Sequence, residues 1–195
     1  MQIGCLVMAA GNASRFGENK LATVFEGKSL IERALLAVPQ GIFDEVCIVT
    51  QYDEVEKLAE KYGFRCVRNA YPDWGISHTI LLGTQEMQSC DAILYMVSDQ
   101  PLLDEKSVEK VVREWKKHPD KIVGAAHHGK RGNPCIFPRE FFTELMQLQE
   151  DHGGNTVIRR YPERLLLVEV AKNELTDIDT PKALEELKKS VNESI

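Results

Sequence analysis

The sequence contains no apolar run long enough to span a membrane, and no basic segment followed by an apolar stretch precedes its first strand pattern at Ile3. Nothing in it therefore predicts a transmembrane helix or a secretion signal. We expect a cytoplasmic protein without a membrane partner.

Cysteine is also scarce, and its five positions are odd in number and never spaced as Cys-x-x-Cys. This pattern argues against a zinc site and against a disulfide framework. Cys5 and Cys47 lie in strand-like runs, where we expect small buried thiols. Positive charge is in deficit as well. A net charge of −6 argues against nucleic acid as a partner, although locally gathered cations could still bind a small anionic substrate.

The composition is that of a folded protein, with 43% hydrophobic and 28% charged residues in 195. This length is sufficient for a full core, and we predict a single domain over residues 1–195. No repeat, low-complexity tract or linker interrupts it.

Strand and helix patterns alternate along the chain. Strands are predicted at 3–9, 46–50, 65–68, 92–97, 122–126, 133–137 and 165–170. Helices are predicted at 29–38, 53–62, 77–87, after Asp104, at 140–149 and from Pro181. Single helices between strands predict an α/β fold with a mostly parallel sheet and helices on both faces, which binds ligands at the carboxyl ends of its strands.

The stretch 127–132 is predicted to be a loop that carries two histidines and two cations. His127, His128 and His152 show no metal-ligand spacing that predicts a site.

The first predicted strand leads into a loop of small residues, where Ala9, Ala10 and Gly11 permit close approach of the backbone to a ligand. Arg15 and Lys20 add a forked and a point cation, a combination suited to a polyphosphate. The stretch matches neither the Walker A pattern nor G-x-G-x-x-G. An ordinary strand-to-helix loop with two solvated cations is the alternative.

Acidic and hydroxyl residues stand at other predicted junctions. Asp99 directly follows an apolar strand and could hold Mg²⁺ or merely cap a turn. Asp177 and Asp179 precede the last helix, whose N-terminus they could favour electrostatically. Around the start of the 77–87 helix, Gly75 permits close approach, and Ser77 and Thr79 supply hydroxyls that could bind a ligand or cap the helix.

These motifs resemble those of the MobA-like nucleotidyltransferases. Residues 8–20 are similar to the family signature Leu-Ala-Ala-Gly-x-Ser-x-Arg-Phe-Gly-x-x-Lys, with Met8 in place of Leu. Residues 75–83 resemble Gly-Met-Ser-x-Ser-Leu-x-x-Gly, and residues 177–181 resemble Asp-Ile-Asp-Thr-Pro. Asp99-Gln100-Pro101 resembles the Asp-Gln-Pro motif of the molybdenum cofactor cytidylyltransferases (MocA-type), where the guanylyltransferase branch typically has Asp-Met-Pro.

Two segments depart from the family pattern. Gly132-Asn133-Pro134 resembles Gly-His-Pro, with asparagine in place of histidine. Residues 153–159 stand where the family commonly has Gly-Asp-x-Gly-Ala-Arg, and they lack its aspartate. The second departure leaves the identity of the acceptor open.

The resemblance implies a Rossmann-like, three-layer fold of the nucleotide-diphospho-sugar transferase type. It implies an enzyme that transfers CMP from CTP to a molybdopterin-type cofactor, with release of pyrophosphate. A molybdenum hydroxylase is the implied client. Two alternatives remain open: a nucleotidyltransferase that uses GTP or a sugar phosphate acceptor, and a non-catalytic carrier of the pterin.

The resemblance also implies roles for individual residues. The implied Mg²⁺ ligands are Asp99 and Asp179, and the implied catalytic residues are Arg15, Lys20 and Asp99. The nucleotide would be bound by Ala9, Ala10, Gly11, Arg15, Lys20, Gly75, Ser77 and Thr79, and the acceptor side would be lined by Gly132, Asn133 and Pro134.

Overall fold

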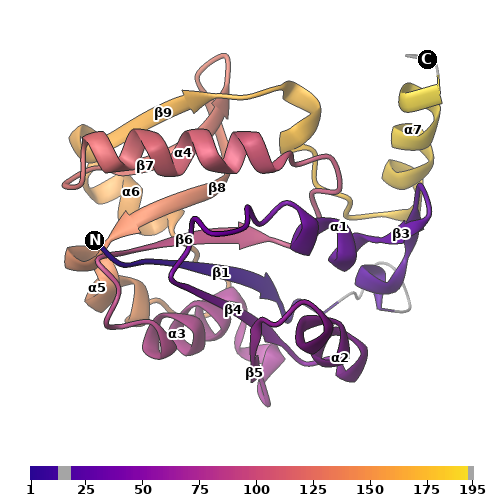
Figure 1. Ribbon diagram of the computed structural model, residues 1–195, viewed down its shortest axis with the longest axis horizontal. Helices are drawn as coiled ribbons and strands as arrows, with labels where there is room; N and C mark the ends of the chain where they lie inside the picture. Colours follow the sequence, from indigo (N-terminus) through magenta and orange to yellow (C-terminus); the bar gives the residue numbers. More distant parts are fainter. Residues whose placement is uncertain (13–18, 193–195) are drawn as a thin grey trace.

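The computed structural model describes residues 1–12 and 19–192, and a seven-stranded sheet forms its centre (Figure 1). The strands, in sequence order, are β1 (Ile3–Ala9), β4 (Glu45–Thr50), β5 (Arg65–Arg68), β6 (Ala92–Val97), β7 (Ile122–His127), β8 (Lys130–Pro138) and β9 (Leu165–Glu169). Their order across the sheet is β5-β4-β1-β6-β8-β7-β9. All neighbours are parallel except β8, which is antiparallel to both β6 and β7. The predicted α/β class with a mostly parallel sheet is confirmed.

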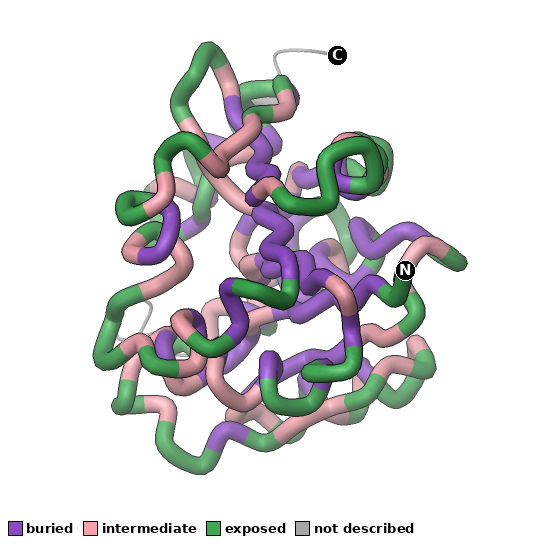
Figure 2. The backbone as a smooth tube through the Cα atoms, turned by 90° about the vertical axis from the view of Figure 1, so that its left-hand side faces the viewer, coloured by how far each residue is buried: buried purple, intermediate pink, exposed green. Residues whose placement is uncertain are grey.

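Helices cover both faces of the sheet, so the fold has three layers. One face carries α1 (Leu30–Leu36), α2 (Asp53–Lys61) and α4 (Glu105–Lys117). The other carries α3 (Ile76–Glu86), α5 (Phe142–Met146) and α6 (Asn155–Arg160). Alternate side chains of β1 divide between the two layers: Cys5 and Val7 pack in the first, and Leu6 in the second. Figure 2 shows the buried strands running through the middle of the molecule.

A smaller unit stands at one end of the sheet (Figure 1). The short strands β2 (Val24–Phe25) and β3 (Lys28–Ser29) pair antiparallel, and α7 (Pro181–Asn192) packs beside them through a separate apolar cluster that includes Phe25, Leu30 and Leu184. Proline opens α7 as predicted, and the Thr180 hydroxyl caps it by accepting from the N–H of Ala183 at 3.1 Å. The 3-10 turns are η1 (Lys20–Ala22), η2 (Pro72–Trp74), η3 (Arg139–Phe141), η4 (Pro162–Arg164) and η5 (Lys172–Leu175).

The prediction of a loop over 127–132 is wrong. β7 and β8 form a hairpin whose turn is only His128 and Gly129, with φ of 48° and 77°. Two consecutive positive φ values define the type I′ turn, which matches the twist of antiparallel strands. The sequence His-Gly is a weaker signal for that turn than Asn-Gly, and the hairpin also explains why β8 runs against its neighbours. The predicted helix at 140–149 is likewise shorter, and α6 was not predicted.

The cysteines follow the prediction. All five thiols are free, and Cys5 and Cys47 are fully buried. Within the described part of the chain, no helix is both long and apolar enough to cross a membrane.

Candidate nucleotidyl-transfer site

The carboxyl ends of β1 and β6 lie side by side because these strands are parallel neighbours in the sheet. The loop after β1 and the segment Ser98–Asp99 after β6 therefore face the same edge. The Ser98 hydroxyl joins them by donating to the carbonyl of Met8 at 2.8 Å. The predicted nucleotide-binding loop and the predicted metal ligand Asp99, which are far apart in the sequence, therefore lie at the same place in the fold.

The start of the loop is held by three consecutive side chains from the end of β4. The Thr50 hydroxyl donates to the Ala9 carbonyl at 2.9 Å, and the Gln51 amide donates to the Ala10 carbonyl at 3.0 Å. The Tyr52 hydroxyl donates to the Gly11 carbonyl at 2.9 Å. These contacts engage the carbonyls of residues 9–11, which leaves the N–H groups at the start of the loop available to an anion. This support was not evident from the sequence.

Lys20 forms ion pairs with both predicted metal ligands. Its ammonium lies 2.7 Å from Asp99 Oδ2 and 3.2 Å from Asp179 Oδ1. Burial lowers the pKa of Lys20, but the two carboxylates outweigh that effect and raise it above its ordinary value. Lys20 is therefore a positively charged group at neutral pH. Arg15, the other predicted cation, lies outside the described residues.

The segment before α7 docks onto the end of β6. The N–H of Ile178 donates to the Asp99 carbonyl at 2.9 Å, and the Ile178 side chain is fully buried. Asp177 accepts a hydrogen bond from the Gln100 side-chain amide at 2.9 Å. Desolvation, followed by the negative charge of Asp99, raises the pKa of Asp177. The sequence predicted no role in metal binding for Asp177, but the structure places it near the predicted metal ligands Asp99 and Asp179.

The carboxylates fit a magnesium ion. Asp99 Oδ1 is buried and has no hydrogen-bond partner among the described residues, while Oδ2 binds Lys20. An unsatisfied buried carboxylate oxygen is costly unless something binds it, and Mg²⁺ prefers carboxylate oxygens. Asp179 is more exposed and shares Lys20 with Asp99. This donor set suits an ion that keeps several waters.

Two cavities open at this edge of the sheet. The smaller has a volume of about 430 Å³. Its lining includes residues predicted to bind the nucleotide or the metal ion, namely Ala10, Gly11, Lys20, Gly75, Thr79 and Asp99. The larger, of about 740 Å³, includes Gly132, Asn133 and Asp177 in its wall. Met8, Ile76 and Val97 line both, so the cavities adjoin. Their placement suits two substrates that meet near Asp99.

The predicted nucleotide residues differ in where they lie. Ala9 is buried as the last residue of β1 and does not line the smaller cavity. Gly75 precedes α3 with φ of 83°, and a Cβ there would lie 2.3 Å from the Glu150 carbonyl oxygen. Ser77 is buried outside this cavity and donates to the Trp74 carbonyl, whereas Thr79 lines the cavity and accepts from Asn69. The Ser77 hydroxyl therefore contacts the turn before α3 but does not cap the helix, since this end of α3 has no side-chain cap hydrogen bond.

The larger cavity is rich in positive charge, which the sequence analysis did not anticipate. Its lining includes Lys130, Arg131, Arg159 and Lys172. The predicted acceptor residues Gly132 and Asn133 share this wall, whereas Pro134 follows a cis peptide bond and does not line the cavity. The atypical segment at 153–159 contributes here too, because Gly153 to Thr156 line the cavity and Asn155 accepts from Arg131. Such a lining favours an anionic ligand.

Comparison with known families identifies the chain. The family model described as a MobA-like NTP transferase domain matches residues 5–165. The chain therefore belongs to the MobA-like NTP transferase family.

The individual relatives share only low sequence identity with this chain. The chain is 23% identical over 198 residues to the purine catabolism protein PucB of Bacillus subtilis, covering 95% of each chain. It is 34% identical over 116 residues to a probable molybdenum cofactor guanylyltransferase of Thermococcus gammatolerans, covering 57% of this chain and 56% of the relative. A solved nucleotidyl transferase from Methanothermobacter thermautotroptrophicus superposes with a TM-score of 0.83 at 22% identity, covering 100% of this chain and 99% of that chain. This likeness shows the predicted nucleotide-diphospho-sugar transferase type of fold.

Proposed function

We propose that this member of the MobA-like NTP transferase family transfers CMP from CTP to a phosphate of a molybdopterin-type cofactor, with release of pyrophosphate. One observation carries the proposal. Lys20, Asp99 and Asp179 converge beside two adjoining cavities, one lined by the loop after β1 and the other by cations. The first suits a nucleoside triphosphate, and the second suits an anionic acceptor.

Positioning and charge neutralisation would supply most of the catalysis. The attacking phosphate is already ionised, so the reaction needs no strong general base. The N–H groups of the Gly11 loop would bind the triphosphate, and Lys20 would neutralise charge that develops on the departing pyrophosphate. We assign the same role to Arg15. Lys20 now pairs with Asp99 and Asp179, so the triphosphate would compete with these carboxylates for its ammonium.

Asp99 and Asp179 would hold Mg²⁺, which would supply positive charge that neutralises the phosphates. The unpartnered Asp99 Oδ1 supports this assignment. On the acceptor side, Arg131 and Lys172 would attract the phosphate of the pterin, and Asn133 would contact it from β8. The product would then pass to a molybdenum hydroxylase as client.

Substitution of Asp99 tests the proposal. Asp99→Asn removes the charge and preserves the size of the side chain. We expect it to lower Mg²⁺-dependent pyrophosphate release from CTP by at least about 100-fold, the range for loss of one preorganised electrostatic contact. Asp104→Asn is the matched control, because Asp104 only caps α4 and asparagine caps equally well. A wild-type rate in Asp99→Asn would refute the metal assignment.

GTP is the second candidate nucleotide, since the relative from Thermococcus gammatolerans is named a probable guanylyltransferase. The Asp99-Gln100-Pro101 motif supports CTP instead. Gln100 is fixed by Asp177, and its side-chain oxygen is buried without a partner in the described part of the chain. The rate of pyrophosphate release, measured with CTP alone and with GTP alone, separates the two candidates. Binding of the pterin without turnover of either nucleotide would indicate a carrier.

A further inference from the structure

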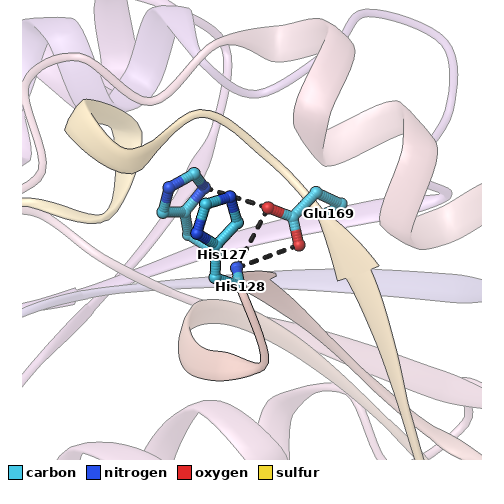
Figure 3. Close-up of side chains that lie close together, drawn as sticks. All are labelled: His127, His128 and Glu169. Atoms are coloured by element: carbon cyan, nitrogen blue, oxygen red, sulfur yellow. Dashed lines mark hydrogen bonds and ion pairs between the residues drawn. The ribbon is translucent and has the colours of Figure 1, made fainter.

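Two histidines and a glutamate lie together next to the larger cavity, whose lining includes His127. His127 ends β7, His128 begins the turn of the β7–β8 hairpin, and Glu169 ends the parallel neighbour β9. One ligand atom from each side chain lies within 4.8 Å of the others. Figure 3 shows both imidazoles on the side of the hairpin that faces the carboxylate. Glu169 lies more than 40 positions beyond the two adjacent histidines in the sequence, and the pairing of β7 with β9 brings it to them.

Backbone contacts hold two of these side chains in place. The N–H of His128 donates to both Glu169 oxygens, at 3.0 and 3.2 Å. His127 Nδ1 lies 2.9 Å from Glu169 Oε1 and 3.1 Å from the Val170 carbonyl oxygen. These two contacts fix the orientation of the His127 ring beside the carboxylate. Outer contacts of this kind orient histidines in metal sites.

His128 supplies an independent observation. Its φ of 48° is a conformation that costs most L-residues about 1–2 kcal/mol and that glycine or asparagine adopts more readily. The chain nevertheless presents an imidazole there, stacked on His127 with 4.1 Å between ring centroids. The type I′ turn itself requires this conformation, so the feature that points to a ligand is the imidazole at a position that suits glycine or asparagine. Because His128 is exposed, its ring can turn about its side-chain torsions toward an ion.

We propose that His127, His128 and Glu169 bind one divalent transition-metal ion of the Zn²⁺ class. Two imidazoles and a carboxylate are the ligands of such ions, whereas Mg²⁺ and Ca²⁺ prefer oxygen ligands alone. Three protein ligands leave a position for water or for an anion from the cavity. The ion would link the hairpin to β9 and would add positive charge beside Lys130 and Arg131.

Cobalt titration tests this site without nucleotide or acceptor, so its result is independent of the proposed transferase activity. Tag-free protein, stripped with chelator and supplied with excess Mg²⁺, is titrated with Co²⁺ while visible absorption is recorded. We expect one equivalent to bind, without the thiolate-to-metal absorption that cysteine ligands would give, and Zn²⁺ to displace it.

Two variants remove ligands while they preserve the local fold. His128→Asn keeps a residue suited to positive φ, and Glu169→Gln keeps an acceptor for the His128 N–H. Each should weaken Co²⁺ binding by about 100-fold or more. His118→Gln is the control, because His118 contacts Glu114 at 3.5 Å elsewhere on the surface, and it should bind like the wild type. Absence of stoichiometric binding in the wild type, or undiminished binding in Glu169→Gln, would overturn the proposal.

Discussion

Gly75 is a position where the addition of a single methyl group should both destabilise the protein and distort the nucleotide side of the site. Its φ of 83° and ψ of −175° belong to a region that is essentially restricted to glycine. A Cβ would lie 2.3 Å from the Glu150 carbonyl oxygen and 2.8 Å from the Asp151 nitrogen. The backbone at 150–151 would have to move, and Asp151 lines the smaller cavity together with Gly75.

The cost of Gly75→Ala has two parts. Forcing alanine into this conformation costs about 1–3 kcal/mol. Displacing Glu150 also loses the hydrogen bond that its carbonyl accepts from the N–H of Ser77, worth about 0.5–1.5 kcal/mol. We expect a loss of roughly 2–4 kcal/mol in the free energy of unfolding. For a chain of this size, that loss corresponds to a fall of roughly 5–15 °C in Tm.

Gly63→Ala separates the steric clash from the backbone conformation. Gly63 follows α2 with φ of 73°, and a Cβ there would meet nothing within 4 Å. This variant should lose only about 1–2 kcal/mol and keep the wild-type affinity for nucleotide. Thermal melting of both variants, with and without CTP, measures the difference. Equal losses of stability and equal nucleotide affinity in the two variants would refute the reasoning.

Two further substitutions test the site. Tyr52→Phe removes the hydrogen bond to the Gly11 carbonyl, which is worth about 0.5–1.5 kcal/mol. We expect the KM for the nucleotide to rise by roughly 2–10-fold with little change in kcat. An unchanged KM would show that this contact does not position the loop. Asp177→Asn should stabilise the protein at pH 7. Folding raises the pKa of Asp177, so the aspartate lowers the free energy of unfolding as the pH rises through the pKa of the folded state. The advantage of Asp177→Asn in urea denaturation should disappear below the ordinary aspartate value of 3.8, where both states hold the proton, and an advantage that persists there would contradict the assigned cause.

Local patterns were sufficient to predict most of the sheet. The bounds of β1 and β6 agree with the prediction to the residue, because each is an apolar run between clear turn signals. Those of β5 agree as well, although its sequence Arg-Cys-Val-Arg is a weaker strand pattern. The hairpin of β7 and β8 escaped prediction because its turn uses His128 and Gly129 rather than the strongest turn residues. α6 escaped because it has only six residues and begins after two glycines.

The site was predictable in its residues but not in its contacts. Motifs pointed to Lys20, Asp99 and Asp179, yet the ion pair between Lys20 and Asp179 joins residues 159 positions apart. The support of the Gly11 loop by Thr50 to Tyr52 depends on the pairing of β1 with β4, which no local pattern reveals. The cationic lining of the larger cavity gathers Arg131, Arg159 and Lys172 from three elements in the same way.

The most direct test of the proposed function follows the fate of the nucleotide. CTP labelled at its α-phosphate is incubated with the protein, Mg²⁺ and molybdopterin, and both pyrophosphate and labelled pterin are measured. The account predicts equal amounts of the two products, a requirement for Mg²⁺, and little turnover with GTP. Pyrophosphate release from GTP alone, or bound pterin with no label transferred from any nucleotide, would contradict it.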